Sequence, residues 1–256
     1  MSTFGELYAD YYDVFYAAKD YDAESAAVEA VLRGQGVAPG ATVVSLGCGT
    51  MGHETRLAQK GYRFIGIDRS PQMVALAEKR AAADGLAGVR VQEGDMRTFA
   101  VEHPVEAVVS LFNVLSYCRD VSELEAVFRH VHDALKPRGV FFFDAWYAPA
   151  VRSDPPRDRW KRFSRGGAEL LRLTHAAPGT DGATTTLQIE LLEIIGDRVA
   201  RRAVEEHPVR AWDLADIEQA LDRAGLALVG TSRFPRLDAP LSEEHWDVAV
   251  TARRMS

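Results

Sequence analysis

The stretch from residue 43 to residue 68, VVSLGCGTMGHETRLAQKGYRFIGID, constrains the fold of this 256-residue chain more than any other segment. An apolar run (43–46) leads into a turn with three glycines, a helical stretch follows, and a second apolar run ends at Asp68. Glycine is favoured where the backbone turns sharply or approaches a ligand closely, because it carries no Cβ. The pattern predicts a strand, a tight loop, a helix and a second strand, which is the opening unit of a doubly wound parallel sheet.

Strand-like and helix-like stretches keep alternating after this unit. We expect strands at 42–46, 62–67, 89–92, 107–112 and 140–143, with helices between them. Asp22 is the expected N-cap of an early helix, Ser70-Pro71 begins another, and Ser122 with Glu125 forms a capping box for a third. This alternation predicts an α/β fold, a Rossmann-like doubly wound sheet with helices on both faces.

The pattern changes after residue 150. Three strand-like runs, at 169–176, 184–195 and 198–210, are joined by short connections of the hairpin type. They predict a small antiparallel sheet, residues 151–210, inserted into a main domain that consists of residues 1–150 and 211–256. Within the main domain we expect a helical lid at 1–36, a helix at 213–224 and two closing strands at 226–232 and 246–252.

Residues 150–166, which precede these strands, are polar and basic. Six arginines and lysines between 152 and 165 lie around Trp160 and Phe163. Such a segment can clamp a diphosphate and stack a base. The alternative is a solvated basic loop, and we expect the loop.

Composition excludes several classes of protein. The chain has 30 Lys and Arg against 37 Asp and Glu, and the net charge of −7 argues against nucleic acid as the main partner. No apolar run approaches the roughly 18 residues that span a bilayer, and the first residues do not form a secretion signal. Cys48 and Cys118 do not suggest a disulfide framework, so we expect a cytoplasmic protein. No cluster has metal-ligand spacing, so we expect no metal.

The glycine turn leaves two cofactors open. Residues 47–52 read Gly-Cys-Gly-Thr-Met-Gly, which matches the dinucleotide fingerprint G-x-G-x-x-G. Glu54 argues against a dinucleotide, because a carboxylate in the first helical turn would repel a pyrophosphate bound there. Gly94-Asp95-Met96 follows the third predicted strand, where the acid can accept a hydrogen bond from an adenine amino group. These details favour S-adenosylmethionine over NAD.

Taken together, these motifs resemble class I S-adenosylmethionine-dependent methyltransferases. The glycine loop, the acid ending the second strand, the G-D-M and the residues 135–140 before the fifth strand occur in order over nearly the whole chain. The resemblance implies a seven-stranded sheet whose seventh strand is antiparallel to the others. It also implies a cofactor site formed by Tyr21, Gly47, Cys48, Gly49, Asp68, Arg69, Met73, Asp95, Met96, Leu111 and Asn113.

Two positions depart from this family's pattern. Ser45 stands where the family usually carries an acid, and Met51 stands where it carries its third glycine. Ser45 keeps open a protein that binds the cofactor without transferring a methyl group. The literal fingerprint at 47–52 keeps open an NAD-dependent dehydrogenase.

A narrower resemblance is carried by Tyr12-Asp13, Lys19-Asp20-Tyr21, Trp146 and the segment 207–210. These residues are similar to those of bacterial amino-sugar N-methyltransferases, which act on nucleotide-linked deoxysugars in natural-product pathways. The resemblance implies an inserted sheet that covers the acceptor pocket. It implies a small-molecule acceptor, best described as the amine of an amino sugar or related secondary metabolite, and a homodimer is left open.

Doubly wound sheets bind ligands at the C-terminal ends of their strands, which is where acceptor-facing residues are expected. Asn113-Val114 and 144–149 differ from the amino-sugar family there, so O-methylation of a hydroxyl stays open. The candidate catalytic residues at these ends and on the inserted sheet are Tyr117, Asp144, His175 and His207. The candidate acceptor-binding residues are Tyr12, Tyr16, Trp146, Tyr147 and Arg210.

Overall fold

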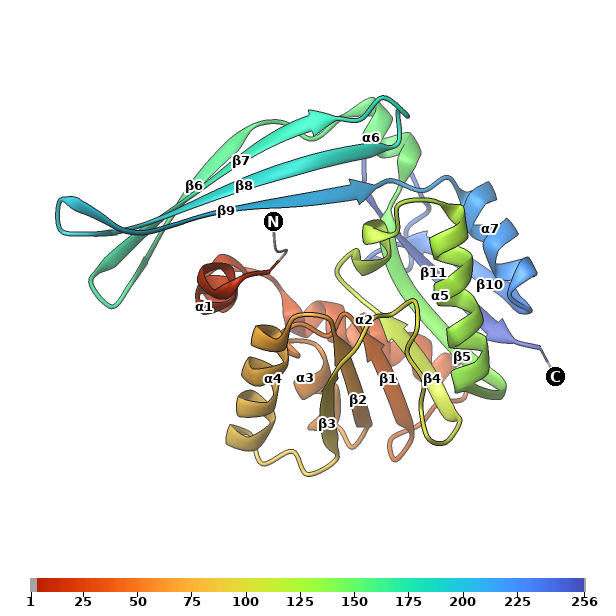
Figure 1. Cartoon of the computed structure of the whole chain (residues 1–256). Coiled ribbons are helices and arrows are strands. Elements are labelled where there is room, and N and C mark those ends of the chain that lie inside the picture. The colour runs from red at the N-terminus through yellow and green to blue at the C-terminus, as the bar shows by residue number, and fades with distance from the viewer. Residues whose placement is uncertain (1–3, 256) are drawn as a thin grey trace.

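The computed structural model describes residues 4–255, and its strands form two separate sheets (Figure 1). The strands of the larger sheet are β1 (Thr42–Leu46), β2 (Arg63–Asp68), β3 (Val89–Glu93), β4 (Val105–Ser110), β5 (Leu135–Trp146), β10 (Leu226–Arg233) and β11 (Asp247–Arg254). They lie in the order β10-β11-β5-β4-β1-β2-β3. The first five strands pair in parallel, whereas β11 is antiparallel to both β5 and β10. The predicted seven-stranded Rossmann-like sheet is confirmed.

Helices cover both faces of this sheet. One face carries α5 (Val121–Ala134) and α7 (Leu214–Arg223), and the other carries α2 (Tyr21–Gly34), α3 (Glu54–Ala58) and α4 (Pro71–Ala83). Adjacent residues of β1 show the division, because Val44 packs with the α5 side and Val43 with the α2 side. Strands buried on both faces need continuous apolar sequence, and residues 141–143 are three fully buried phenylalanines. Within residues 4–255, no helix combines the length and apolar character needed to cross a bilayer.

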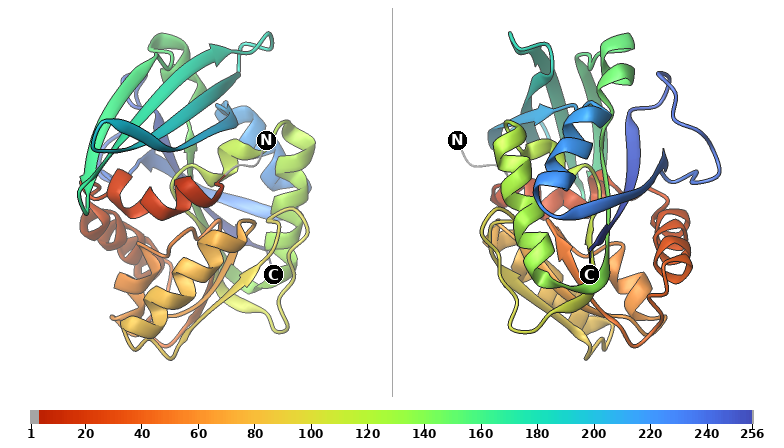
Figure 2. Two further views of the ribbon diagram at one scale, coloured as in Figure 1. Left: turned by 60° about the vertical axis from the view of Figure 1, so that its left-hand side comes forward. Right: turned by 90° about the vertical axis from the view of Figure 1, so that its right-hand side faces the viewer.

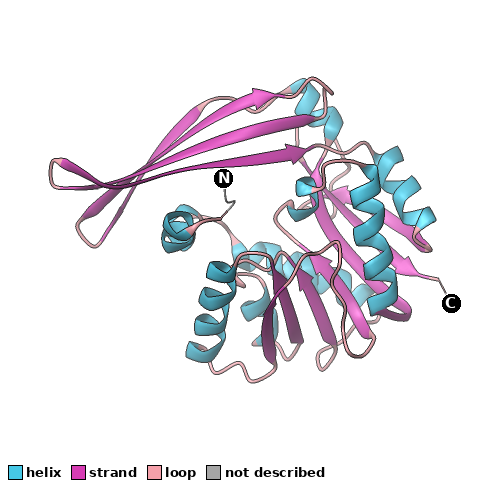
Figure 3. Cartoon of the chain, in the orientation of Figure 1, coloured by secondary structure: helices cyan, strands magenta, loops and turns pink. Residues whose placement is uncertain are grey.

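The smaller sheet has four antiparallel strands: β6 (Arg159–Arg165), β7 (Ala168–Pro178), β8 (Thr184–Ile195) and β9 (Arg198–Arg210). It follows the short α6 (Ala148–Ser153) and extends from one end of the large sheet as a layer of its own (Figure 3). The three predicted strands are confirmed, but the expected loop at 150–166 is wrong because 159–165 form β6. This basic segment becomes a strand through pairing with β7, with Phe163 packed inward and Trp160 exposed.

Helix α1 (Glu6–Phe15) packs against the inserted sheet (Figure 2). Tyr8, Tyr11 and Phe15 recur at helical spacing, so they share one face of the helix. They are buried in one hydrophobic cluster with Leu170 of β7 and Leu191 of β8. The N-terminal helix and the inserted sheet therefore share a core that is separate from the two cores of the large sheet.

Several predicted boundaries are wrong because side chains nearby cap or extend the elements. Asp20, not Asp22, caps α2 by accepting from the Ala23 N–H at 2.9 Å. In the same way α5 is capped by Asp120 instead of the predicted Ser122. Strand β5 starts five residues before its predicted start, because Leu135 already pairs with Val105 and the expected breaker Arg138, with φ of 64°, lies in the irregular stretch before Val140.

Candidate active site

A cavity of about 740 Å³ lies where the parallel strands of the large sheet end, facing the inserted sheet. Its walls come from α1, the glycine loop after β1, the ends of β2, β3 and β4, and the inner side of β6 to β9. The predicted residues that line it are Tyr12, Tyr16, Gly47, Gly49, Asp68, Arg69, Met73, Asp95, Met96, Leu111, Asn113, Tyr117, Trp146 and His207. One space thus contains most of the predicted cofactor residues together with several predicted acceptor residues.

The glycine loop forms one wall of this cavity. Gly47 and Gly49 have φ values of 64° and 52°, in the left-handed region that favours glycine. A Cβ at Gly47 would lie 2.5 Å from the side chain of Val114, and one at Gly49 would lie 3.5 Å from the hydroxyl of Tyr12. Met51 is also left-handed, with φ of 60°, so it keeps the glycine-like conformation at a cost of roughly 1–2 kcal/mol.

Two acids at the ends of neighbouring strands differ in their partners. Asp68 accepts hydrogen bonds from the N–H groups of Gly49 at 2.8 Å and Ser70 at 2.9 Å. Burial nevertheless raises the pKa of Asp68. Asp95 accepts from the guanidinium and the N–H of Arg97, and these bonds lower the pKa of Asp95. Asp68 is therefore fixed against the glycine loop with lone pairs left for hydroxyl donors, whereas Asp95 is shared with Arg97.

The start of α3 carries a buried acid. Glu54 is 2% exposed and accepts a hydrogen bond of 2.5 Å from the hydroxyl of Ser45 on β1. Its second oxygen has no partner among the described residues. A carboxylate at this helix start opposes a bound phosphate, so the structure disfavours a dinucleotide at this loop.

Tyr117 and His207 meet at the cavity, although 90 residues separate them in the sequence. Tyr117 ends the short helix η1 (Val114–Tyr117) after β4, and its hydroxyl lies 2.8 Å from Nδ1 of His207 on β9. Burial raises the pKa of Tyr117, so this hydroxyl keeps its proton at neutral pH. The ring of His207 is 2% exposed and contacts the rings of Phe4 and Tyr8.

Arg172 of β7 brings a positive charge to the same cavity. Its guanidinium lies 5.3 Å from the ring centre of Phe15 and 5.7 Å from that of Tyr8, within the range of cation–π attraction. Its Nη1 lies 3.4 Å from the hydroxyl of Tyr16, and its buried Nε has no partner among the described residues. An arginine in this state presents an unsatisfied donor to an anionic ligand.

Residues 43–139 match the family model described as a methyltransferase domain. A curated relative, the dTDP-3-amino-3,4,6-trideoxy-alpha-D-glucopyranose N,N-dimethyltransferase of Streptomyces venezuelae, is 26% identical over 224 residues, covering 86% of this chain and 90% of the relative. The chain is an S-adenosylmethionine-dependent methyltransferase. The predicted enzyme class and cofactor are confirmed.

Solved structures show that this methyltransferase shares its whole fold with other enzymes. An S-adenosylmethionine-dependent methyltransferase from Clostridium acetobutylicum matches with a TM-score of 0.80 at 18% identity, covering 96% of this chain and 97% of the other. The sugar N-methyltransferase KedS8 from Streptoalloteichus matches with a TM-score of 0.79 at 23% identity, covering 100% and 97%. The inserted sheet is therefore within the matched region in both cases.

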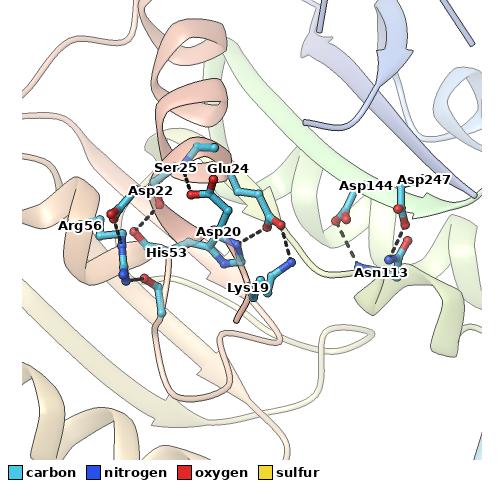
Figure 4. Close-up of polar contacts among 12 residues, drawn as sticks. Lys19, Asp20, Asp22, Glu24, Ser25, His53, Arg56, Asn113, Asp144 and Asp247 are labelled. Carbon is cyan, nitrogen blue, oxygen red and sulfur yellow. Dashed lines mark hydrogen bonds and ion pairs between the residues drawn. The ribbon is translucent and has the colours of Figure 1, made fainter. Parts of the chain in front are cut away.

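Asp144, one of the predicted catalytic residues of the methyltransferase, does not line the cavity. Its carboxylate is buried and accepts from the N–H of Asn113 at 3.2 Å, while the Asn113 side chain donates to Asp247 at 2.8 Å (Figure 4). Burial and the neighbouring Asp247 raise the pKa of Asp144 to about 8. Phe112 and Asn113 both have positive φ, so Asp144 supports a strained loop that lines the cavity, and the structure corrects its predicted contact with the acceptor.

His175 is also corrected. It is exposed on β7, pairs with Asp158 at 2.9 Å, and lies on the side of the strand that faces away from the cavity-lining Thr174. Strand alternation decides this, because neighbouring side chains point to opposite faces of a sheet. His207, the other predicted histidine of the inserted sheet, lies on the face of its strand that lines the cavity.

Four other predicted site residues of the methyltransferase lie outside the cavity lining. Tyr147 occupies the N-cap position of α6 without a side-chain cap, and Arg210 pairs with Asp181 at 2.7 Å. Cys48 is buried within the glycine loop with its pKa raised by burial. Tyr21 packs over Gly52, where a Cβ would meet its ring at 2.5 Å. These four side chains therefore pack next to the residues of the cavity wall and do not line the cavity themselves.

Sequence reasoning did not select several residues that line the cavity. Tyr8 and Arg172 were not proposed as site residues, and Arg159 and Lys161 belong to the basic segment that was expected to be a solvated loop instead of a diphosphate clamp. Lys161 and Arg172 are directly opposite each other on β6 and β7, and Arg159 shares the inward parity of Lys161. Correct assignment of residues 159–165 as a strand would have separated the inward cations from the outward Arg162.

Proposed function

We propose that this methyltransferase transfers the methyl group to the amine of an amino sugar. The observation that carries the proposal is one cavity with the glycine loop and Asp68 in one wall and the Tyr117–His207 pair in another. The curated relative from Streptomyces venezuelae, named as a dimethyltransferase of a dTDP-linked amino sugar, supports the same acceptor class. The alternatives of O-methylation and of cofactor binding without transfer are not favoured.

The acceptor carries an anionic group in this proposal. Arg159, Lys161 and Arg172 line the cavity, and no carboxylate within residues 4–255 forms an ion pair with any of them. Arg159 and Lys161 are exposed, whereas Arg172 is half-buried and its Nε has no partner within residues 4–255. A ligand that supplies negative charge would satisfy this donor. Arginine binds phosphate oxygens in a bidentate manner, which supports a diphosphate-linked sugar.

Different residues around the cavity would bind the cofactor and the acceptor. When bound, S-adenosylmethionine supplies an electrophilic methyl group on a sulfonium sulfur. Gly47, Gly49, Asp68 and Asp95 would hold it, since their backbone and carboxylate groups line one part of the cavity. Positioning of the two reactants can lower the barrier by roughly 7–11 kcal/mol.

An amine reaches the active site mostly protonated at neutral pH, and its lone pair must be free before it can attack. Tyr117 and His207 are the candidate groups for removing that proton, because they form a hydrogen-bonded pair at the cavity wall. Asp144 is too far removed for this role, since Asn113 separates it from the cavity. Tyr12 and Trp146 remain proposed contacts for the sugar ring.

The test uses three acceptors with the purified protein and S-adenosylmethionine: a dTDP-linked 3-amino sugar, its 3-hydroxy counterpart and the same amino sugar without the nucleotide. Mass spectrometry of the product and release of S-adenosylhomocysteine report the transfer. We expect methylation of the amine in the linked sugar and much slower reaction of the free sugar. Methylation of the 3-hydroxy counterpart instead of the amine would overturn the proposal in favour of O-methylation.

Two further parts of the proposal concern the setting of the enzyme. We infer a cytoplasmic location, which the two free cysteines, Cys48 and Cys118, support. The acidic net charge of −7 supports a small-molecule acceptor over nucleic acid. A homodimer remains a prediction, and size-exclusion chromatography with light scattering tests it.

A further inference from the structure

Glu205 occupies a buried position next to the Tyr117–His207 pair. It is 2% exposed on β9, and its Oε2 lies 3.0 Å from Nε2 of His207. The same carboxylate accepts hydrogen bonds of 2.8 Å from the backbone N–H groups of Phe4 and Gly5, at the start of α1. Gly5 and Glu205, 200 positions apart in the sequence, thus meet at one side chain.

The number of donors determines which side chain can stand at this position. Three N–H groups converge on the two oxygens of Glu205: His207 Nε2 and Phe4 N on Oε2, and Gly5 N on Oε1. Only an ionised carboxylate accepts at both oxygens and donates at neither. A glutamine would direct its NH₂ group at one of these donors and leave a buried mismatch.

These contacts fix the direction of the hydrogen bonds that lead to the cavity. Because Glu205 is an acceptor, Nε2 of His207 carries the hydrogen and Nδ1 carries the lone pair. The Tyr117 hydroxyl must then donate to Nδ1 across 2.8 Å. Its remaining lone pairs are free for a donor in the cavity, so Tyr117 presents an acceptor to the substrate.

We propose, on the basis of the proposed amine methylation, that Glu205 is a positioning residue that both latches the start of α1 over the cavity and orients His207 and Tyr117 to take a proton from the amine. The ammonium N–H bond breaks and its proton moves to the Tyr117 oxygen. The proton of that hydroxyl moves to Nδ1 of His207. The resulting imidazolium pairs with the Glu205 carboxylate, and the amine keeps the electron pair with which it attacks.

The charged and titratable groups around this relay come from several elements. His207 faces Tyr117 of η1, Tyr8 of α1 and Glu205 of its own strand. Tyr117 is also influenced by Tyr16 of α1, Arg172 of β7 and Arg69 after β2. Burial, Tyr16 and Glu205 raise the pKa of Tyr117 and the two arginines lower it, with a net rise, so Tyr117 passes a proton on and does not itself become charged.

The central experiment compares the wild-type enzyme with Glu205→Gln on the linked amino sugar. The pH is varied from roughly 6.5 to 10, because this range includes the pKa of an amine. We expect kcat of the variant to fall by at least about tenfold near neutral pH, within the range of general acid–base effects. The defect should shrink as pH rises, because the amine then arrives without its extra proton. A defect of equal size at every pH, or no defect, would overturn the relay.

Matched variants separate the relay from simple loss of structure. Glu190→Gln changes a half-buried carboxylate on β8 that pairs with Arg202, and it should leave the pH profile unchanged. Tyr117→Phe should reproduce the pH-dependent defect, and combining it with Glu205→Gln should add little more. Additive defects would overturn the proposal, and Tyr117→Phe alone still tests the relay if Glu205→Gln does not fold.

The latch has its own test. Gly5 has φ of −69°, which proline can adopt, so Gly5→Pro removes one N–H donor to Glu205 while Gly5→Ala keeps it. We expect Gly5→Pro to raise KM for the acceptor equally at all pH values, with Gly5→Ala close to wild type. Equal KM values for the two variants would overturn the latch. If the wild-type enzyme methylates no amino sugar, the proposed function itself has failed, which is distinct from either result.

Discussion

The hydroxyl of Ser45 at the end of β1 donates to the carboxylate of Glu54 at the start of α3, at 2.5 Å. The acid that related methyltransferases carry on the strand is absent here, and a buried acid reaches the same strand position from the helix. Both side chains are buried, and Glu54 keeps one oxygen without a partner among the described residues. The glycine loop therefore lies over a carboxylate that has a single hydrogen-bond donor.

This pair gives a first prediction for stability. Ser45→Ala removes the donor and leaves the Glu54 carboxylate buried without a partner, so the free energy of unfolding should fall by about 1–3 kcal/mol in urea denaturation. The control is Ser110→Ala on the neighbouring β4, whose hydroxyl is equally buried but makes only a long bond of 3.4 Å to the Leu46 carbonyl. An effect at Ser45 no larger than that at Ser110 would contradict the prediction.

A second prediction compares two left-handed glycines. Gly47 and Gly166 have φ of 64° and 58°, but a Cβ at Gly47 would strike Val114 at 2.5 Å, whereas nothing lies within 4 Å at Gly166. Gly166→Ala should cost about 1–2 kcal/mol of stability and leave cofactor binding unchanged. Gly47→Ala should weaken binding of S-adenosylmethionine by about tenfold or more, equivalent to about 1.4 kcal/mol. Calorimetric titration of both variants measures this, and equal affinities would refute it.

Asp144 predicts a pH dependence of stability. Its pKa is raised from 3.8 to about 8 in the folded state, so the folded protein holds a proton that the unfolded chain releases. Stability from this group is complete below about pH 4 and is lost as pH rises to about 8. Asp144→Asn cannot release a proton, so its stability relative to wild type should increase by up to about 1.4 kcal/mol per pH unit across that window.

Unfolding curves measured between about pH 4 and 9 check the Asp144 prediction, because this range covers the shift of the Asp144 pKa to about 8. The matched control is Asp197→Asn, whose carboxylate is 96% exposed and which should follow the wild-type profile. Parallel profiles for Asp144→Asn and wild type would show that the buried carboxylate is not protonated.

Arg172 leads to a prediction for acceptor binding. Its unsatisfied Nε and its position on the cavity wall indicate contact with an anionic group of the acceptor. Arg172→Gln should raise KM for a diphosphate-linked sugar by about 10- to 100-fold, matching the roughly 1.5–3 kcal/mol of a hydrogen bond to a charged group. Affinity for S-adenosylmethionine should not change. Arg202→Gln, on the outer face of the inserted sheet, is the control and should leave KM unaltered.

The sequence was sufficient to predict the large sheet because its signals are local. Each strand of the parallel sheet is a short apolar run that ends at a glycine, an acid or a cap residue, as at Leu46 and Asp68. Burial on both faces makes these runs continuous, so they stand out in composition alone. Gly47, Gly49 and Asp68 could be predicted to lie near the cofactor loop for the same reason. Gly47 directly follows the first apolar run, Gly49 lies in the turn after it, and Asp68 ends the second run.

The acceptor side was harder to predict because its residues meet only through long-range pairing. Strand β6 has a basic sequence, and its strand character comes from its neighbour β7. Tyr117 and His207 were chosen individually, but their contact joins the end of β4 to the inserted sheet. Glu205 gave no signal in the sequence, since all three of its donors depend on the tertiary fold. The face of the sheet on which a side chain lies differs between His175 and His207, and it depends on the pairing register of the strands.

Helix α1 packs on strands that are made well over 100 residues later, and this imposes an order on synthesis. As the chain leaves the ribosome, the aromatic face of α1 can first meet Met73 of α4, and Leu170 of β7 and Leu191 of β8 complete the cluster only later. The parallel sheet can begin to assemble from β1, β2 and β4 in the meantime. The part of the N-terminal helix that packs on the inserted sheet therefore stays uncovered until that sheet has been translated.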